Sequence, residues 1–61
     1  MTKIEVVAKF DNIGETLLVI NPGELKGLDR FVTDGASVYE VIQLLPGGDP
    51  DRIGVRTKQL S

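Results

Sequence analysis

The sequence predicts an all-β protein, a small five-stranded barrel that forms a single domain over residues 1–61. Two observations lead to this prediction. Five short segments are rich in β-branched, aromatic and aliphatic residues, and such segments favour strands. Gly, Pro, Asn and Asp separate these segments, and these residue types favour turns. Because 61 residues suffice for one small core only, we expect the strands to curl around it.

Residues 2–10 alternate between two faces, as expected for a half-buried strand. One face carries Thr2, Ile4, Val6, Ala8 and Phe10, and the other carries Lys3, Glu5, Val7 and Lys9. This alternation predicts that the Phe10 side chain lies in the core. Residues 11–14 follow as a tight turn, because Asp, Asn and Gly surround a single apolar residue there.

The second strand, Thr16–Ile20, is apolar on both of its faces. A small domain covers only one face of such a strand well, so the other face is a candidate subunit contact. The sequence therefore predicts self-association through Leu17, Leu18, Val19 and Ile20. The strand ends at Asn21-Pro22-Gly23, since Pro donates no ladder hydrogen bond and Gly permits the chain to reverse.

The chain then turns twice before the next long segment. Residues 24–29 include Gly27 and are too few for a stable helix, so we expect a loop with a single helical turn. Phe31–Thr33 is the short third strand, with the Phe31 side chain in the core. Asp34-Gly35 is a turn, because Gly accepts a positive φ and Asp bonds the backbone nearby.

Residues 38–45 allow two interpretations. Three of the first five residues are β-branched and a fourth is Tyr, which favours a fourth strand. Four apolar residues of the same segment also follow helical spacing after a Ser-x-x-Glu capping box. We predict the strand and keep a short helix at 38–45 as the alternative. With that helix the fold is α+β and β-grasp-like.

Residues 46–52 connect the fourth strand to the fifth, Ile53–Gln59. This loop holds two Gly, two Pro and two Asp, which bury almost nothing, so we expect a mobile connector. Asp49 and Asp51 do not make a calcium loop, which needs at least six oxygen ligands. The sequence thus predicts no metal site.

Composition excludes several chemistries. The chain has no cysteine and no histidine, which removes disulfides, thiolate metal sites and histidine general bases. No serine has an activating base at a recognisable spacing, so we expect no catalytic residues, no cofactor and no enzymatic activity. No apolar run approaches the roughly 20 residues of a membrane span. The expected protein is a complete small reading frame that is cytoplasmic and does not bind membranes.

Basic residues and one tyrosine are the candidates for partner binding. Arg56 and Lys58 share one face of the last strand, and Arg52 precedes that strand. Lys26 and Arg30, in an earlier loop, are expected to fold toward them. The predicted contact residues are Tyr39, Lys26, Arg30, Arg52, Arg56 and Lys58. Tyr39 is expected to be exposed, as contact tyrosines often are. A net charge of −2 and a pI near 4.8 disfavour nucleic acid as the partner, because phosphate neutralisation requires a positive excess.

Two families of small barrels resemble parts of residues 13–57. One pattern comprises Gly23, Glu24, Leu25, Lys26, Asp29 and Val32, followed by Gly48-Asp49 and Ile53-Gly54-Val55. It is similar to β-barrel domains of translation factors, although Leu28 replaces the Gly that precedes Asp29 in those domains. A second pattern, which resembles SH3-like barrels, comprises Val32, Asp34, Gly35, Tyr39, Glu40 and Val41. Both resemblances imply a five-stranded SH3-like or related barrel that binds rather than catalyses.

Three hypotheses about function remain. The first is a non-catalytic binding or regulatory module that acts through protein–protein contacts. The second is binding of RNA or single-stranded nucleic acid through the basic residues. The third is a homo-oligomeric structural component, for example of a viral assembly, held together by the second strand.

Overall fold

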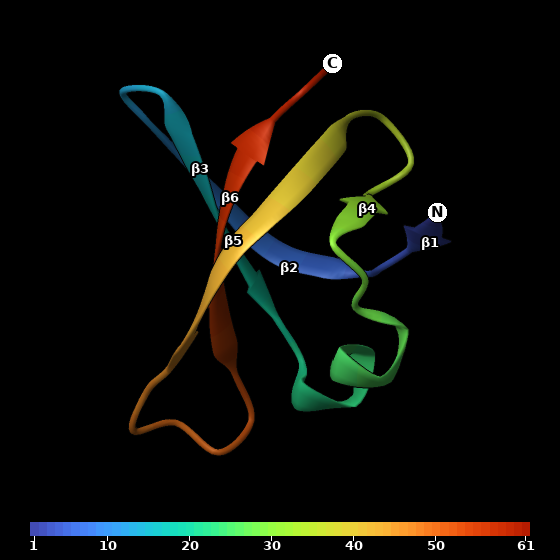
Figure 1. Ribbon diagram of the computed structural model, residues 1–61. Helices are drawn as coiled ribbons and strands as arrows, with labels where there is room; N and C mark the ends of the chain where they lie inside the picture. Colours follow the sequence, from blue (N-terminus) through green and yellow to red (C-terminus); the bar gives the residue numbers. More distant parts are fainter.

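The computed structural model describes residues 1–61 and contains one six-stranded sheet and one 3₁₀ helix (Figure 1). The strands are β1 (Thr2–Lys3), β2 (Val6–Asn12), β3 (Glu15–Ile20), β4 (Phe31–Thr33), β5 (Val38–Pro46) and β6 (Ile53–Gln59). The helix, η1, spans Pro22–Gly27. The strand order is β1-β4-β5-β6-β3-β2, and the sheet curls into a half-barrel. The 3₁₀ helix has only 6 residues, and the structure contains no helix that could span a bilayer.

The first predicted strand is divided in two, so the prediction of five strands is wrong by one. β1 pairs in parallel with β4 at one end of the sheet, and β2 pairs antiparallel with β3 at the other end. Only Ile4 and Glu5 separate β1 from β2. Ile4 lies at this bend, is buried, and donates its backbone N–H to the Thr33 carbonyl over 2.9 Å. A single bent segment thus brings the two ends of the sheet together around the core.

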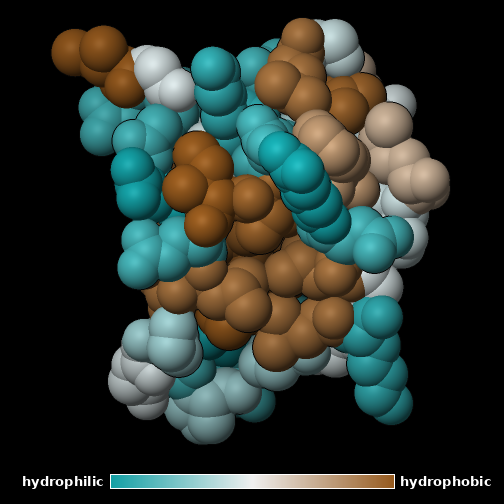
Figure 2. All heavy atoms as spheres, in the orientation of Figure 1, coloured by the Kyte–Doolittle hydropathy of each residue, from teal (hydrophilic) through white to brown (hydrophobic).

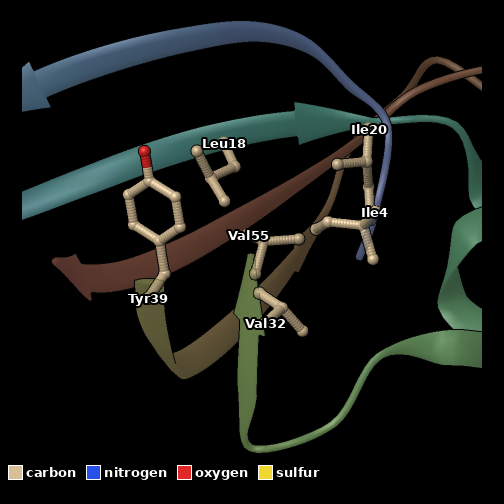
Figure 3. Close-up of a cluster of buried hydrophobic side chains, with 6 residues drawn as sticks. All are labelled: Ile4, Leu18, Ile20, Val32, Tyr39 and Val55. Atoms are coloured by element: carbon tan, nitrogen blue, oxygen red, sulfur yellow. The ribbon is translucent and has the colours of Figure 1, made fainter. Parts of the chain in front are cut away.

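The core lies on the inner face of the half-barrel. Its fully buried apolar side chains point toward one another (Figure 3) and belong to Ile4, Leu18, Ile20, Val32, Tyr39 and Val55. Leu25 and Leu28, from η1 and the residue after it, pack against this cluster. Thr57 is also buried, and its hydroxyl donates to the Thr16 carbonyl over 2.8 Å. The core is therefore small, and no buried side-chain polar atom in it lacks a hydrogen-bond partner.

Residues 38–45 form a strand, as predicted, and the helical alternative is wrong. β5 pairs with β4 through Val38–Glu40 and with β6 along its length. The preceding turn also follows the prediction, since Gly35 has a φ of 101°. One oxygen of Asp34 accepts hydrogen bonds from the backbone N–H groups of Ala36 and Ser37, each at 2.9 Å. The turn therefore fixes the start of β5.

Tyr39 is fully buried, so the prediction that it is an exposed contact residue is wrong. Its ring belongs to the core, and its hydroxyl donates to the second carboxylate oxygen of Asp34 over 3.1 Å. The backbone N–H groups of Ser37 and Ala36, followed by the Tyr39 hydroxyl, hold the pKa of Asp34 below its ordinary value of 3.8. Tyr39 therefore joins the core to the turn and has no surface to offer a partner.

The two phenylalanines lie outside the core, contrary to the prediction. A β-bulge between Val6 and Ala8 shifts the register of β2, so that Val6 faces Ile20 while Ala8 faces Val19. The bulge reverses which side chains point inward. Phe10 consequently lies on the outer face and is 57% exposed. Phe31 is 38% exposed, and its ring centroid is 5.3 Å from the guanidinium carbon of Arg30.

The loop after β5 is exposed from Gly47 to Arg52. Its only backbone support is local. The Asp51 N–H donates to the Asp49 carboxylate over 2.8 Å, and the Arg52 N–H donates to the Asp49 carbonyl over 3.4 Å. As predicted, these residues contribute nothing to the core.

Candidate interaction surface

Four apolar side chains from neighbouring strands share the outer face of the sheet. Residues directly opposite each other in a ladder point to the same face, so the register assigns each of them. Phe10 faces Leu17, Val19 faces Gly54, and Gly54 faces Leu45. We call the group formed by Phe10, Leu17, Val19 and Leu45 the outer apolar face. Phe10 and Leu45 are 57% and 40% exposed, Leu17 and Val19 are half-buried, and the leucines of η1 and its flank pack on the core instead.

Gly54 lies in the middle of the outer apolar face. A Cβ atom placed on it would lie 3.4 Å from Leu17 Cδ1 and 3.5 Å from Leu45 Cβ. Because Gly54 has no side chain, Leu17 and Leu45 both pack over its backbone and form a continuous apolar surface. Next to this surface is an open recess of about 250 Å³, lined by Asn12, Glu15, Thr16, Leu17, Leu45 and Arg56.

A charged pair borders the recess. The Arg56 guanidinium donates from Nε to one oxygen of the Glu15 carboxylate and from a terminal nitrogen to the other, the latter over 3.0 Å. These hydrogen bonds lower the pKa of Glu15 and raise the pKa of Arg56. Arg56 also donates to the Gln43 side-chain oxygen over 3.3 Å. The positive charge at the rim is thus compensated within the chain.

The remaining predicted basic residues do not gather into one patch. Arg30 forms an ion pair with Glu40 at 3.1 Å, and Lys58 faces Glu40 from β6. Arg52 precedes β6, at the end opposite Lys58, and donates to the Asn21 side chain over 2.6 Å. Lys26 lies on η1 and forms no ion pair. Arg56 and Lys58 lie on the outer side of β6, Arg30 immediately precedes β4, and each of the three has an acidic neighbour.

The segment predicted for self-association is divided between the two faces of β3. Leu18 and Ile20 are fully buried in the core, whereas Leu17 and Val19 belong to the outer apolar face. Sequence reasoning missed Phe10 and Leu45. The alternation of residues 2–10 assigned Phe10 to the core, because nothing in that pattern marks the bulge. Leu45 acquires its position only through the pairing of β5 with Gly54.

Apolar surface continues along the second half of β5. β4 pairs with β5 only as far as Glu40, so residues 42–46 have a neighbouring strand on one side alone. Ile42 and Leu44 are exposed in this part of the strand. In the view with β5 in front, apolar atoms cover the middle of the molecule (Figure 2). Leu44 is paired with the core residue Val55, so its side chain points to the inner side of the sheet and does not extend the outer apolar face.

The geometry offers few other sites. No group of three or more acidic residues is placed to hold a metal ion. A second recess, of about 340 Å³ near the β2–β3 turn, is lined without any hydrophobic residue.

No family model, curated protein or solved structure matches this chain. Its function is therefore inferred from its own geometry.

Proposed function

We propose that this chain is a small, non-catalytic protein-interaction module of the SH3-like barrel kind. It acts in the cytoplasm as a binding or regulatory unit, and its contact surface is the outer apolar face. One observation carries the proposal: Phe10, Leu17, Val19 and Leu45 form a contiguous apolar group on a sheet face that the chain leaves uncovered. Clustered exposed apolar side chains with a polar border are typical of protein–protein contact surfaces.

The charges around this surface favour a protein partner over a nucleic acid. Affinity for nucleic acid comes largely from cations that neutralise phosphates. Arg56 and Arg30 already form ion pairs with Glu15 and Glu40, and the chain carries a net charge of −2. A phosphate backbone would have to displace these carboxylates. An apolar protein surface can bind while both ion pairs stay in place.

Capture from a lysate of the source cell tests the proposal. Immobilised wild-type chain is compared with Phe10→Lys, which places a charge in the outer apolar face, and with Ile13→Lys. Ile13 is 98% exposed at the tip of the β2–β3 turn and lies outside that face, so it is the matched control. We expect Phe10→Lys to lose the captured proteins and Ile13→Lys to retain them. Equal capture by all three chains, each folded by circular dichroism, would refute the proposal.

A further inference from the structure

We propose that the partner of the outer apolar face is a second copy of this chain, docked face to face around a two-fold axis near Leu17. The inference rests on the proposed function and specifies its partner. In such a contact the same surface serves on both copies, so each protruding group must meet a complementary recess of the other copy. The outer apolar face contains both parts.

Phe10 is the protruding group, and the recess beside Leu17 is its complement. The Phe10 ring is 57% exposed and lies next to Leu17 across the β2–β3 ladder. The recess that Leu17 lines extends from Asn12 on β2 to Leu45 on β5 and has a volume of about 250 Å³, and a cavity of about 150 Å³ is enough for a benzene-sized ring. A two-fold axis at Leu17 places each Phe10 over the recess of the other copy and brings the two Leu17 side chains together.

The charges of the surface permit this self-docking. Glu15 and Arg56 compensate each other at the rim of the recess, so two copies approach without like-charge repulsion. Arg56 also lines the recess that would receive the ring of the other copy, and a guanidinium attracts an aromatic face. The chain already contains one such arrangement, between Arg30 and Phe31.

The edges of the sheet are less suited to joining two copies. On β2, the bulge before Ala8 distorts the edge, and Lys9 faces Leu18, which places a charge on the inner side. Both features block pairing with another strand. The free half of β5 also contains a bulge, between Val41 and Gln43, and ends in Pro46, which has no N–H to donate. The outer face carries neither obstacle.

The size of the contact sets the expected affinity. The contact area is estimated from the sheet around the outer apolar face. Its four strands, β2, β3, β6 and β5, lie about 4.8 Å apart, and the six residues of β3 rise about 3.3 Å each, so this part of the sheet measures roughly 20 by 20 Å. That area is about half of the roughly 800 Å² that each partner buries in a standard interface. We therefore expect a weak dimer with a dissociation constant in the micromolar range.

Sedimentation equilibrium from about 1 µM to about 1 mM tests the dimer. We expect the wild-type mass to rise from 6.6 kDa toward twice that value. Phe10→Ser should raise the dissociation constant at least about tenfold, as loss of a central aromatic contact does, and Ile13→Ser should leave it unchanged. A wild-type chain that remains monomeric, or a dimer insensitive to Phe10→Ser, would overturn the inference. The proposed function would still stand if Phe10→Lys abolished capture of another protein.

Isotope-filtered NMR then tests the arrangement of the two copies. In a mixture of ¹³C-labelled and unlabelled chains, only contacts between copies produce filtered cross-peaks. We expect cross-peaks from the Phe10 ring to the methyl groups of Leu45 and Leu17 of the other copy, and none from Ile13. Intermolecular cross-peaks confined to the edge of β2 or to residues 42–46 of β5 would overturn the face-to-face arrangement.

Discussion

The two faces of β3 carry the same types of apolar residue but differ in how far their side chains are buried. Leu18 and Ile20 point inward and are fully buried, whereas Leu17 and Val19 point outward onto a surface that the chain leaves uncovered. The strand and its local sequence are common to both faces. The difference shows that hydrophobicity alone does not identify a core position, because the elements packed on each side decide which face is covered.

The largest expected loss of folding stability comes from substitutions on the inner face of β3, and matched substitutions on its outer face should cost much less. Leu18→Asp buries a charge without a partner, and we expect it to abolish folding. Even Leu18→Ala should cost about 3 kcal/mol, which is comparable to the whole stability of a domain this small. Leu17→Asp should leave the monomer folded. Circular dichroism at low protein concentration measures both, and unfolding of Leu17→Asp would show that the outer face also belongs to the core.

A smaller effect is expected from the one hydroxyl in the apolar core cluster. Tyr39→Phe removes the hydrogen bond to Asp34 and should cost about 1 kcal/mol, or about 4–8 °C in thermal midpoint. The matched change on the outer face is Phe10→Tyr, which adds an exposed hydroxyl and should not alter monomer stability. Thermal melts at low concentration compare the two. Equal midpoints for Tyr39→Phe and the wild type would mean that the hydroxyl contributes nothing.

The pH dependence of stability should reflect the hydrogen bonds that Asp34 accepts in the turn before β5. The folded pKa of Asp34 lies below its ordinary value of 3.8, so the folded state binds its proton less readily than the unfolded state. The stabilisation is thus complete above that ordinary value and is lost as the pH falls below 3.8 through the folded pKa. Asp34→Asn should lower stability at neutral pH and flatten this acid loss. A melting series from pH 7 to about pH 2 checks the slope, and identical slopes would contradict the assignment.

The exposed ion pair between Glu15 and Arg56 should contribute less to folding stability than the hydrogen bonds that Asp34 accepts. The pKa of Glu15 is also lowered, mainly by its hydrogen bonds to Arg56, so its contribution has the same sign with pH. Both side chains are substantially exposed, and water and salt weaken such pairs. We expect Glu15→Gln to change the thermal midpoint less than Asp34→Asn does. A larger change for Glu15→Gln would reverse the ranking.

The smallest effect is expected from the loop after β5, which belongs to neither face. Replacing residues 47–52 by Asn-Gly keeps the pairing of Pro46 with Ile53, and loop-closure entropy varies slowly with length. We expect a nearly unchanged midpoint and unchanged association. A large loss of stability would mean that Asp49 or Asp51 anchors the sheet. Loss of association at constant stability would make this loop the contact surface instead of the outer apolar face.

The sequence was sufficient to predict most of the strands, but not the division of the first one or which side chains point into the core. Strand composition and turn residues located β3 to β6, and the Asp34-Gly35 turn was predicted with its mechanism. The bend at Ile4 and the bulge before Ala8 were not predictable, because alternation continues through both. One unpaired residue in β2 reversed the face of Phe10, and with it the identity of the candidate site. The burial of Tyr39 likewise depends on tertiary packing that no local pattern encodes.

The thermal midpoint of the wild-type chain, measured over a hundredfold range of concentration, tests most directly whether the outer face is a contact surface. If the second face of β3 is covered by another copy, association stabilises the folded state by mass action. We predict that the midpoint rises by several degrees as concentration increases, and that Phe10→Ser removes this dependence while leaving the dilute midpoint in place. A wild-type midpoint that does not change with concentration would contradict coverage of the outer apolar face by a second copy.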